Sequence, residues 1–381
     1  KSASASLQSC HALKYLALLD AENSLPPLLH RVYQALTTLT EVHQTTSALQ
    51  ALSAVWFPLV RLGNVAAGAS HIPSLMELTL SGIDPNDVHK TWSTLRFYSV
   101  MLAGLPLIPI AEDCPPGRDP AHHEVVRQVT DTFADWAFRF LDQTFSFIMN
   151  QNAHQEANDS TRIDIESRTS EMLFHCALEV LFMQLGDTLF KSALSKVANM
   201  CFTNLLTHQL DHLGILLGCL CRVQPLATVQ KIIPTCLRIL LLSPVERSPR
   251  RHQKSPSMIG KTPSSAGSQG KGGSVGRGAW EDLMSPSNNA KSQWSHSATE
   301  YKLAPLSEME LIYYMGILRV MAEEAGDYLI PYSEQLMAVI EQGMQVEERA
   351  GVLSNAVFKA ANRLLSVLLN ALVTCRPREC R

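Results

Sequence analysis

The chain has 381 residues, of which 46% are hydrophobic and 18% charged, and its mean hydropathy is +0.02. This supply of apolar residues excludes a chain that is disordered throughout, because it is enough for one extended or two compact cores. The formal net charge of −3 gives no support to a basic nucleic-acid coat or to long-range attraction of an anionic ligand.

The start of the chain has no features of a secretory signal. Residues 1–10, KSASASLQSC, include one lysine, no apolar region and no initiator Met, so we expect a stretch of a longer protein without a signal peptide. The cysteines fall mostly within apolar helical patterns, which is typical of free thiols in a reducing compartment. They are Cys10, Cys114, Cys176, Cys201, Cys219, Cys221, Cys236, Cys375 and Cys380.

Two apolar stretches, 97–111 and 213–221, are candidates for membrane insertion by composition. Both are shorter than the ~20 residues that a spanning helix needs, and Pro106 and Pro109 interrupt the first. We interpret both as core segments and expect no membrane association.

Helical periodicity recurs along the chain. Apolar residues follow i, i+3, i+4, i+7 spacing in four segments, which predicts helices over 133–148, 173–185, 190–205 and 353–372. No comparable run alternates with period two. Short breaks at Gly186-Asp187, Gln224-Pro225 and Gly326-Asp327 predict antiparallel helix pairs. The predicted fold class is all-α.

A larger repeat is indicated by three similar segments: His71-Ile72-Pro73, Ile232-Ile233-Pro234 and Leu329-Ile330-Pro331. Each is interpreted as a helix start with Pro in the first turn, where the missing N–H is not needed. The first two prolines are 161 positions apart, and the last two are 41 apart once residues 245–300 are set aside. A unit of roughly 40 residues is the length of a HEAT or armadillo helix pair, although proline near a helix start is also common in other α proteins.

Residues 245–300 differ in composition from the rest. This basic, Ser/Pro/Gly-rich insert has almost no aliphatic residues at its start and is predicted to be disordered, between helical repeats at 1–244 and 301–381 that continue one solenoid. Ser248, Ser255 and Thr262 precede prolines and are candidate phosphorylation sites. A regulated basic tether, or a weak nuclear-import or nucleic-acid contact, is the functional interpretation, and a tolerated surface loop is the favoured one.

The sequence gives little support to catalysis or cofactor binding. The Gly-rich run 267–278 lacks P-loop spacing and has no predicted strand before it or helix after it, so neither a P-loop nor a GxSxG nucleophile elbow is predicted. His208 and His212, four positions apart with Cys201 seven residues before the first, are a candidate zinc site on one helix face, although Gln209 stands where a zincin would have Glu. We predict no catalytic, cofactor-binding or metal site.

Three further groups are interpreted as structural. His122-His123 are adjacent and do not converge. Cys219 and Cys221 are two apart on a helix and point in different directions, unlike a CxxC pair. Glu323-Glu324 and Glu347-Glu348 fall on polar helix faces, where solvation is the default explanation.

One segment carries a resemblance to a known family. Residues 78–90, LTLSGIDPNDVHK, and the following predicted helix 91–105 resemble a turn and helix of the large HEAT-repeat proteasome activators, in their middle region. The turn consists of Gly82, Ile83, Asp84, Pro85, Asn86 and Asp87. The likeness continues through 133–142, 190–202, 232–242 and 311–372, and so covers roughly 50–375. The insert is longer than expected of the family.

The turn also has a physical interpretation that needs no family. Gly82 can end a helix, Asp84-Pro85-Asn86 can form the turn, and Asp84 or Asn86 can cap the next helix. We therefore assign it a structural role.

The resemblance implies a protein that is not an enzyme: an ATP-independent HEAT-solenoid dome over the α-ring of the 20S proteasome core particle, one monomer at each end. It implies promotion of gate opening and of peptide hydrolysis, with acetylated histones as possible partners, a link to DNA repair, and location in nucleus and cytoplasm. Inositol phosphates are possible cofactors for the full-length family, but none is predicted in this segment, and no membrane or direct nucleic-acid partner is expected.

This segment would then be a wall of the dome. The family's gate-opening tail is not recognisable in 376–381, so no gate-opening residue is assigned here. The alternatives are a generic HEAT scaffold for protein interaction or nuclear transport, and a zinc-dependent helical enzyme built on His208 and His212.

Overall fold

The computed structural model describes residues 3–37, 42–60, 68–105, 107, 120–150, 160–243, 306–350 and 355–374. The regular elements of these residues are α-helices and 3-10 helices, which confirms the predicted all-α class. In chain order they are α1 (Ala3–Leu19), α2 (Ala21–Thr37), α3 (Val42–Val60), η1 (Ala69–His71), α4 (Ile72–Thr79), η2 (Leu80–Gly82), α5 (Val88–Ala103), α6 (Pro120–Asn150), α7 (Ser160–Gln184), α8 (Asp187–Thr203), η5 (Thr207–Gln209), α9 (Leu210–Val223), α10 (Pro225–Leu242), α11 (Glu308–Ala325), η6 (Gly326–Tyr332), α12 (Ser333–Ala350) and α13 (Asn355–Thr374).

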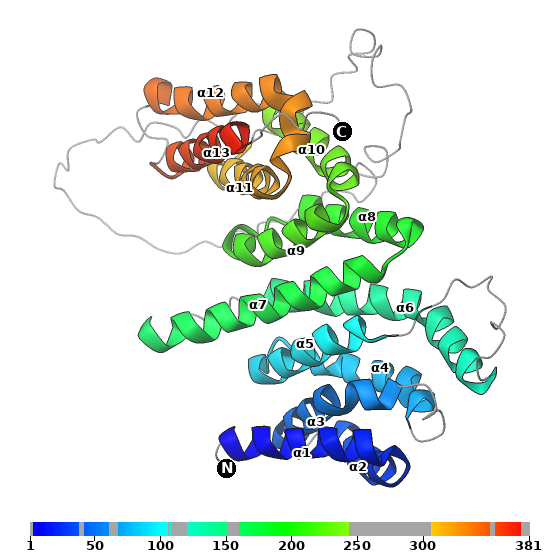
Figure 1. Ribbon diagram of the computed structural model, residues 1–381. Coiled ribbons are helices and arrows are strands. Elements are labelled where there is room, and N and C mark those ends of the chain that lie inside the picture. The colour runs from blue at the N-terminus through cyan, green and yellow to red at the C-terminus, as the bar shows by residue number, and fades with distance from the viewer. Residues whose placement is uncertain are drawn as a thin grey trace, which may run out of the picture.

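The helices stack in two layers along one axis (Figure 1). The odd-numbered α-helices contact one another in sequence from α1 to α13, and the even-numbered ones do so from α2 to α12. Contacts such as those of α2 with α3, α9 with α10 and α12 with α13 join the two layers. In this arrangement, helix pairs pack mainly on their chain neighbours, so the predicted HEAT-like α-solenoid is confirmed.

Helices of the odd layer run parallel to one another. At the end of α7, the side-chain amide of Gln184 donates a hydrogen bond of 3.1 Å to the carbonyl of Leu102, which is near the end of α5. Arg222, at the end of α9, pairs at 2.8 Å with Glu324, at the end of α11. The odd layer therefore has one edge of helix starts and an opposite edge of helix ends.

The predicted periodic segments fall on α6, α7, α8 and α13, and the three predicted breaks coincide with helix junctions. The proline pattern is only partly confirmed. Pro73 lies at the start of α4, as predicted. Pro234 is inside α10, whose first-turn proline is Pro225, and Pro331 lies in η6 rather than in an α-helix. The spacing argument from these three prolines is therefore wrong, because they do not occupy equivalent positions.

An exposed ring makes the interior position of Pro234 tolerable. Pro234 faces solvent, whereas its neighbours Ile232, Ile233 and Cys236 are fully buried. A proline removes one helical hydrogen bond and crowds the preceding turn, and this cost is lowest on the outer face of a helix. The apolar residues around Pro234 therefore correctly predicted a buried helix face. Pro234 itself does not mark the start of that helix.

An aromatic cluster on α5 and α6 is buried in the core. The Trp136 ring stacks on Phe140 at 5.5 Å, and Tyr98 meets both rings edge-on at 5.2 Å. The indole N–H of Trp136 donates to the carbonyl of Met76 at 2.9 Å, and the Tyr98 hydroxyl donates to Thr79 at 3.2 Å. These bonds satisfy the polar tips of buried rings and join α4 to both helices.

Among the described helices, α10 alone has the length and apolar composition of a membrane span. It packs against α8, α9, α11 and α12, with its apolar face buried between them, as a core helix does. The described parts of the two stretches predicted to be core segments, 97–105 and 213–221, do not meet the same test. Although 244–305 lie outside the described residues, α11 packs directly on α9 and α10. The predicted boundaries at 244 and 301 stay predictions.

Ion pairs connect successive helices of the even layer. Both terminal guanidinium nitrogens of Arg139 on α6 donate to the carboxylate of Glu77 on α4. Lys196 on α8 pairs with Asp142 on α6 at 2.8 Å. These side chains are 33–58% exposed, so each pair adds little stability and mainly fixes the register of neighbouring helices.

Candidate functional site

The turn at 82–87 is held by one buried hydroxyl. The side chain of Thr91, in the first turn of α5, accepts a hydrogen bond of 2.9 Å from the N–H of Asp84 and donates one of 2.8 Å to the carbonyl of the same residue. Thr91 is 0% exposed. A single threonine therefore satisfies both backbone groups of the residue at the corner of the turn.

The carboxylates of the turn have separate tasks. Asp84 accepts from the N–H of Asn86 at 2.9 Å and lies 3.8 Å from the ammonium of Lys90. Asp87 is the N-cap of α5 and accepts from the N–H of Lys90 at 2.9 Å. The prediction that Asp84 or Asn86 caps this helix is therefore wrong: their side chains close the turn, and the cap falls three residues before the N–H that it binds.

Gly82 is required by close packing. A Cβ atom at this position would lie 2.2 Å from Oγ1 of Thr94, which is fully buried and donates to the carbonyl of Lys90. Any side chain at 82 would therefore push α5 away from η2.

We expect Gly82→Ala to lower the free energy of unfolding by about 1–3 kcal/mol, because it overpacks this contact. Chemical denaturation is the measurement. Gly186→Ala is the matched control, since nothing lies within 4 Å of a Cβ there. Adding Thr94→Ala should restore part of the loss; equal effects of the two glycine substitutions would contradict the steric explanation.

A groove of about 460 Å³ opens beside the turn, at the edge of helix starts. We call it the turn groove. It is lined by His43, Thr46 and Gln50 of α3, Asp87 of the turn, His89, Trp92, Ser93 and Arg96 of α5, and Leu173 of α7. Three successive odd helices thus contribute to it. The Trp92 ring lies edge-on to buried Phe147 of α6, at 5.5 Å and 83°.

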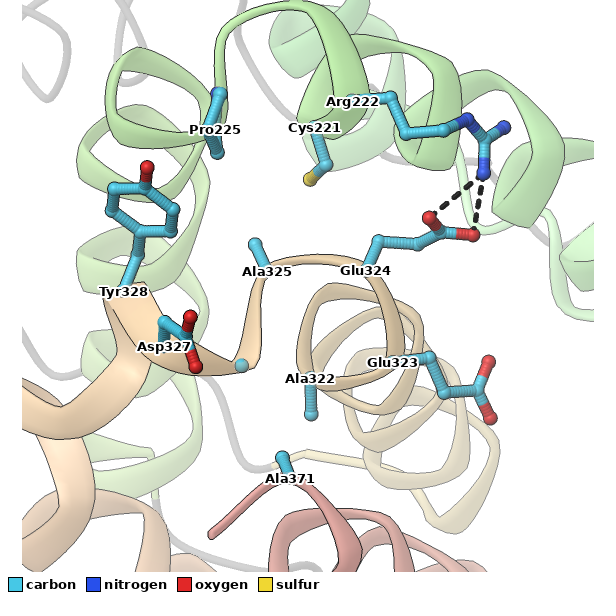
Figure 2. Close-up of a pocket in the computed structure, with 11 residues that line it drawn as sticks. Cys221, Arg222, Pro225, Ala322, Glu323, Glu324, Ala325, Asp327, Tyr328 and Ala371 are labelled. Carbon is cyan, nitrogen blue, oxygen red and sulfur yellow. Dashed lines mark hydrogen bonds and ion pairs between the residues drawn. The ribbon is translucent and has the colours of Figure 1, made fainter. Parts of the chain in front are cut away.

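A second pocket, of about 420 Å³, lies at the edge of helix ends (Figure 2). We call it the acidic pocket, because Glu323, Glu324 and Asp327 line it with Arg222 as the one cation among the lining residues. Figure 2 shows Tyr328 and Pro225 along one wall, Ala325 at the centre, and Ala322 and Ala371 below it. The ends of α9, α11 and α13 meet here.

Arg222 is the hub of this edge. Its guanidinium pairs with Glu324 of α11 at 2.8 Å and with Glu179 of α7 at 3.4 Å, and it contacts the ring of His175. Three successive odd helices are thereby joined through one side chain. Gly218 makes the approach possible, since a Cβ there would be 3.2 Å from the Glu324 carboxylate. This charge network satisfies its own members and leaves no activated nucleophile.

The three residues of the candidate zinc site lie in three different elements. His208 lies in η5, His212 lies in the first turn of α9, and Cys201 lies in α8, so the prediction of one shared helix face is wrong. The ring of His212 packs edge-on against Phe174, and burial lowers its pKa. Among the described residues, no group of three or more His, Cys, Asp or Glu is placed to hold a metal.

The other histidine and cysteine pairs are embedded in packing. His122 and His123, on the first turn of α6, are buried. Cys219 contacts the carbonyl of His175 at 3.6 Å, and Cys221 lies 3.5 Å from the sulfur of Met321. The six described cysteines are free thiols. Burial raises the pKa of Cys201, Cys219 and Cys221 to about 12.

We expect these three thiols to resist alkylation in the native chain at pH 8, because the reactive thiolate is suppressed and access is blocked. Iodoacetamide labelling followed by mass spectrometry tests this, with the denatured chain as control.

A raised folded-state pKa of these thiols also means that the unfolded chain releases their protons at lower pH than the folded chain does. Stability should therefore fall as pH rises from about 9 towards 12. Rapid native labelling of Cys219 would contradict the buried environment.

Some predicted positions lie outside the described residues. These include Ser248, Ser255 and Thr262, the Gly-rich run 267–278 and Cys114. Neither the Arg222 hub nor the turn groove is predicted by the sequence. Arg222 gave no local signal, because its partners are 43 and 102 positions away in the chain.

Comparison with known proteins agrees with the fold. A family model described as the mid HEAT repeats region of proteasome activator complex subunit 4 matches residues 1–114 and 111–240. Proteasome activator complex subunit 4 of Xenopus laevis is 29% identical over 246 residues, which are 62% of this chain and 13% of that protein. The Homo sapiens protein of that name is 28% identical over 245 residues, with the same two shares. Proteasome activator subunit 4 of Arabidopsis thaliana is 20% identical over 386 residues, 96% of this chain and 18% of that protein.

The two-layer stack of helix pairs defines the class as a HEAT-type α-solenoid. Within this class, the chain belongs to the proteasome activator complex subunit 4 family and represents its mid HEAT-repeat region. The family is one of regulatory HEAT-repeat proteins. The chain spans about 13% of the length of the animal relatives described above.

Proposed function

We propose that this chain is a structural wall of an ATP-independent activator that caps the ends of the 20S proteasome core particle and promotes opening of its gate. The observation that carries the proposal is the match of the mid-region family model to residues 1–114 and 111–240. The alternative is a generic HEAT scaffold for protein interaction or nuclear transport, which would share the helix pairs but not this family signature.

The mechanism suited to this fold is a shift in the population of gate states. A cap that binds the open core particle more tightly than the closed one favours opening by that difference in binding free energy. This chain would make the wall of the cap stiff. The Arg222 network and the Glu77–Arg139 pair hold successive helices in register on the two layers. We assign no core-particle contact to a residue of this chain.

The proposed role is regulatory and not catalytic. Buried thiols with a raised pKa are poor nucleophiles, and the carboxylates of Glu179 and Glu324 are committed to Arg222. Peptide hydrolysis would then belong to the core particle. As part of the same proposal, the parent protein binds the α-ring as one monomer at each end, acts in nucleus and cytoplasm on peptides and acetylated histones, and contributes to DNA repair.

Co-sedimentation of the full-length parent protein with purified 20S core particle tests the proposal, with fluorogenic peptide hydrolysis measured in the same fractions without ATP. We expect comigration and faster hydrolysis than by the core particle alone. A parent protein that fails to bind at several salt concentrations would overturn the activator role and favour the scaffold alternative.

A further inference from the structure

We propose that the turn groove docks an extended acidic peptide segment of a partner protein, with Arg96 as the charged anchor and Trp92 as the aromatic wall. The groove is the one at the edge of helix starts, beside the turn at 82–87. Its volume of about 460 Å³ is large enough for a few side chains and is within the ordinary range of ligand sites.

The charge of the groove decides the class of occupant. Arg96 is exposed, and none of the ion pairs among the described residues involves it. Asp87 is the only carboxylate among the described lining residues, and it is committed to capping α5. The imidazoles of His43 and His89 add ring N–H donors. A carboxylate-bearing peptide therefore meets an available guanidinium and no competing free acid.

The aromatic wall is held in place before any ligand arrives. Trp92 is half-buried, and its ring is fixed edge-on against Phe147, which is 0% exposed. A ring held in this way contributes contact area at little cost in side-chain entropy. Ser93 adds a hydroxyl along the same groove, which suits the backbone of an extended peptide.

The opposite edge of the odd layer would repel the same partner. The acidic pocket presents Glu323, Glu324 and Asp327 against one arginine. An acidic segment is therefore favoured at the turn groove over the acidic pocket. This inference concerns a binding partner of the chain and does not depend on the proposed proteasome role.

Fluorescence anisotropy with the full-length protein tests the proposal. The probe is a fluorescein-labelled peptide of about nine residues with Asp at alternate positions and one central Tyr, and its partner probe carries Asn in place of every Asp. We expect Arg96→Glu to weaken binding of the acidic peptide about tenfold or more, and the Asn peptide to bind at least about tenfold more weakly to the wild type. Arg127→Glu is the matched control, since Arg127 is 52% exposed on α6, away from the groove, and should change the Kd less than about twofold.

Circular dichroism should be unchanged in both variants, because both arginines are at the surface. Equal affinities of the Arg96→Glu and Arg127→Glu proteins would overturn the proposal. So would absence of binding to the wild type, or equal affinity for the acidic and Asn peptides. Displacement of the peptide by inorganic tripolyphosphate at the same concentration as by unlabelled peptide would also overturn it, because it would identify a general anion site.

Discussion

Trp136→Ala should destabilise the chain more than any other single truncation considered, by about 3–5 kcal/mol. Trp136 is 2% exposed, stacks on Phe140 and meets Tyr98 edge-on. Truncation leaves a cavity between α5 and α6, and it also leaves the carbonyl of Met76 without its indole donor. Urea denaturation measures the loss, and hydrogen exchange should show it first in α4, α5 and α6.

Two further variants separate the causes. Trp136→Phe keeps most of the ring contact and removes the hydrogen bond to Met76, so we expect a smaller loss of about 1–3 kcal/mol. Phe57→Ala is the control, because Phe57 is 54% exposed and should cost below about 1 kcal/mol. A Trp136→Ala protein as stable as the Phe57→Ala protein would show that the aromatic cluster does not hold this part of the solenoid together.

Helices and their junctions could be predicted because their signals are local. The apolar spacing in 133–148 follows from one buried face, and the break at Gly186-Asp187 is visible within two residues. The solenoid class followed from a repeat length that rested on Pro73, Pro234 and Pro331. Since only Pro73 occupies the predicted position, the class was right although the register was wrong.

The functional surfaces could not be predicted in the same way. Arg222 reaches Glu179 on α7 and Glu324 on α11, and no spacing in the sequence encodes that contact. Nor does spacing show that Trp92 and Arg96 border a groove with Leu173. Two-layer stacking creates these sites by placing residues of successive pairs side by side. The helices of a solenoid can therefore be predicted from its sequence, whereas the sites along its edges can be identified only in the structure.

The turn at 82–87 shows the same limit on a smaller scale. Its residue types predict a turn, because Gly, Asp, Pro and Asn each favour one. They do not distinguish Asp84, Asn86 and Asp87 as the cap. That choice depends on Thr91, whose hydroxyl fixes the corner and places Asp87 at the start of α5. The turn is therefore a folding element that also positions one wall of the turn groove.

Thr91→Val is the substitution that tests this role, and it should cost about 2–3 kcal/mol of unfolding free energy. Valine fills nearly the same volume, so the loss comes from the N–H of Asp84, which loses its partner, and from its carbonyl, which keeps only the N–H of Asp87, in a site where Thr91 is 0% exposed. Thr91→Ser is the matched control. It keeps the hydroxyl and removes one methyl group, so we expect about 1 kcal/mol.

The two variants should also differ in local dynamics. In Thr91→Val, the amide of Asp84 should exchange with solvent much faster than in the wild type, whereas in Thr91→Ser it should stay protected. Equal stability of the two variants would mean that water replaces the hydroxyl without loss, and that the corner is held by the Asx bond from Asn86 to Asp84 instead. Asp87 and Trp92 line the turn groove, and both come shortly after the corner at Asp84. If the corner loosens in Thr91→Val, the acidic peptide should therefore also bind more weakly in the turn groove.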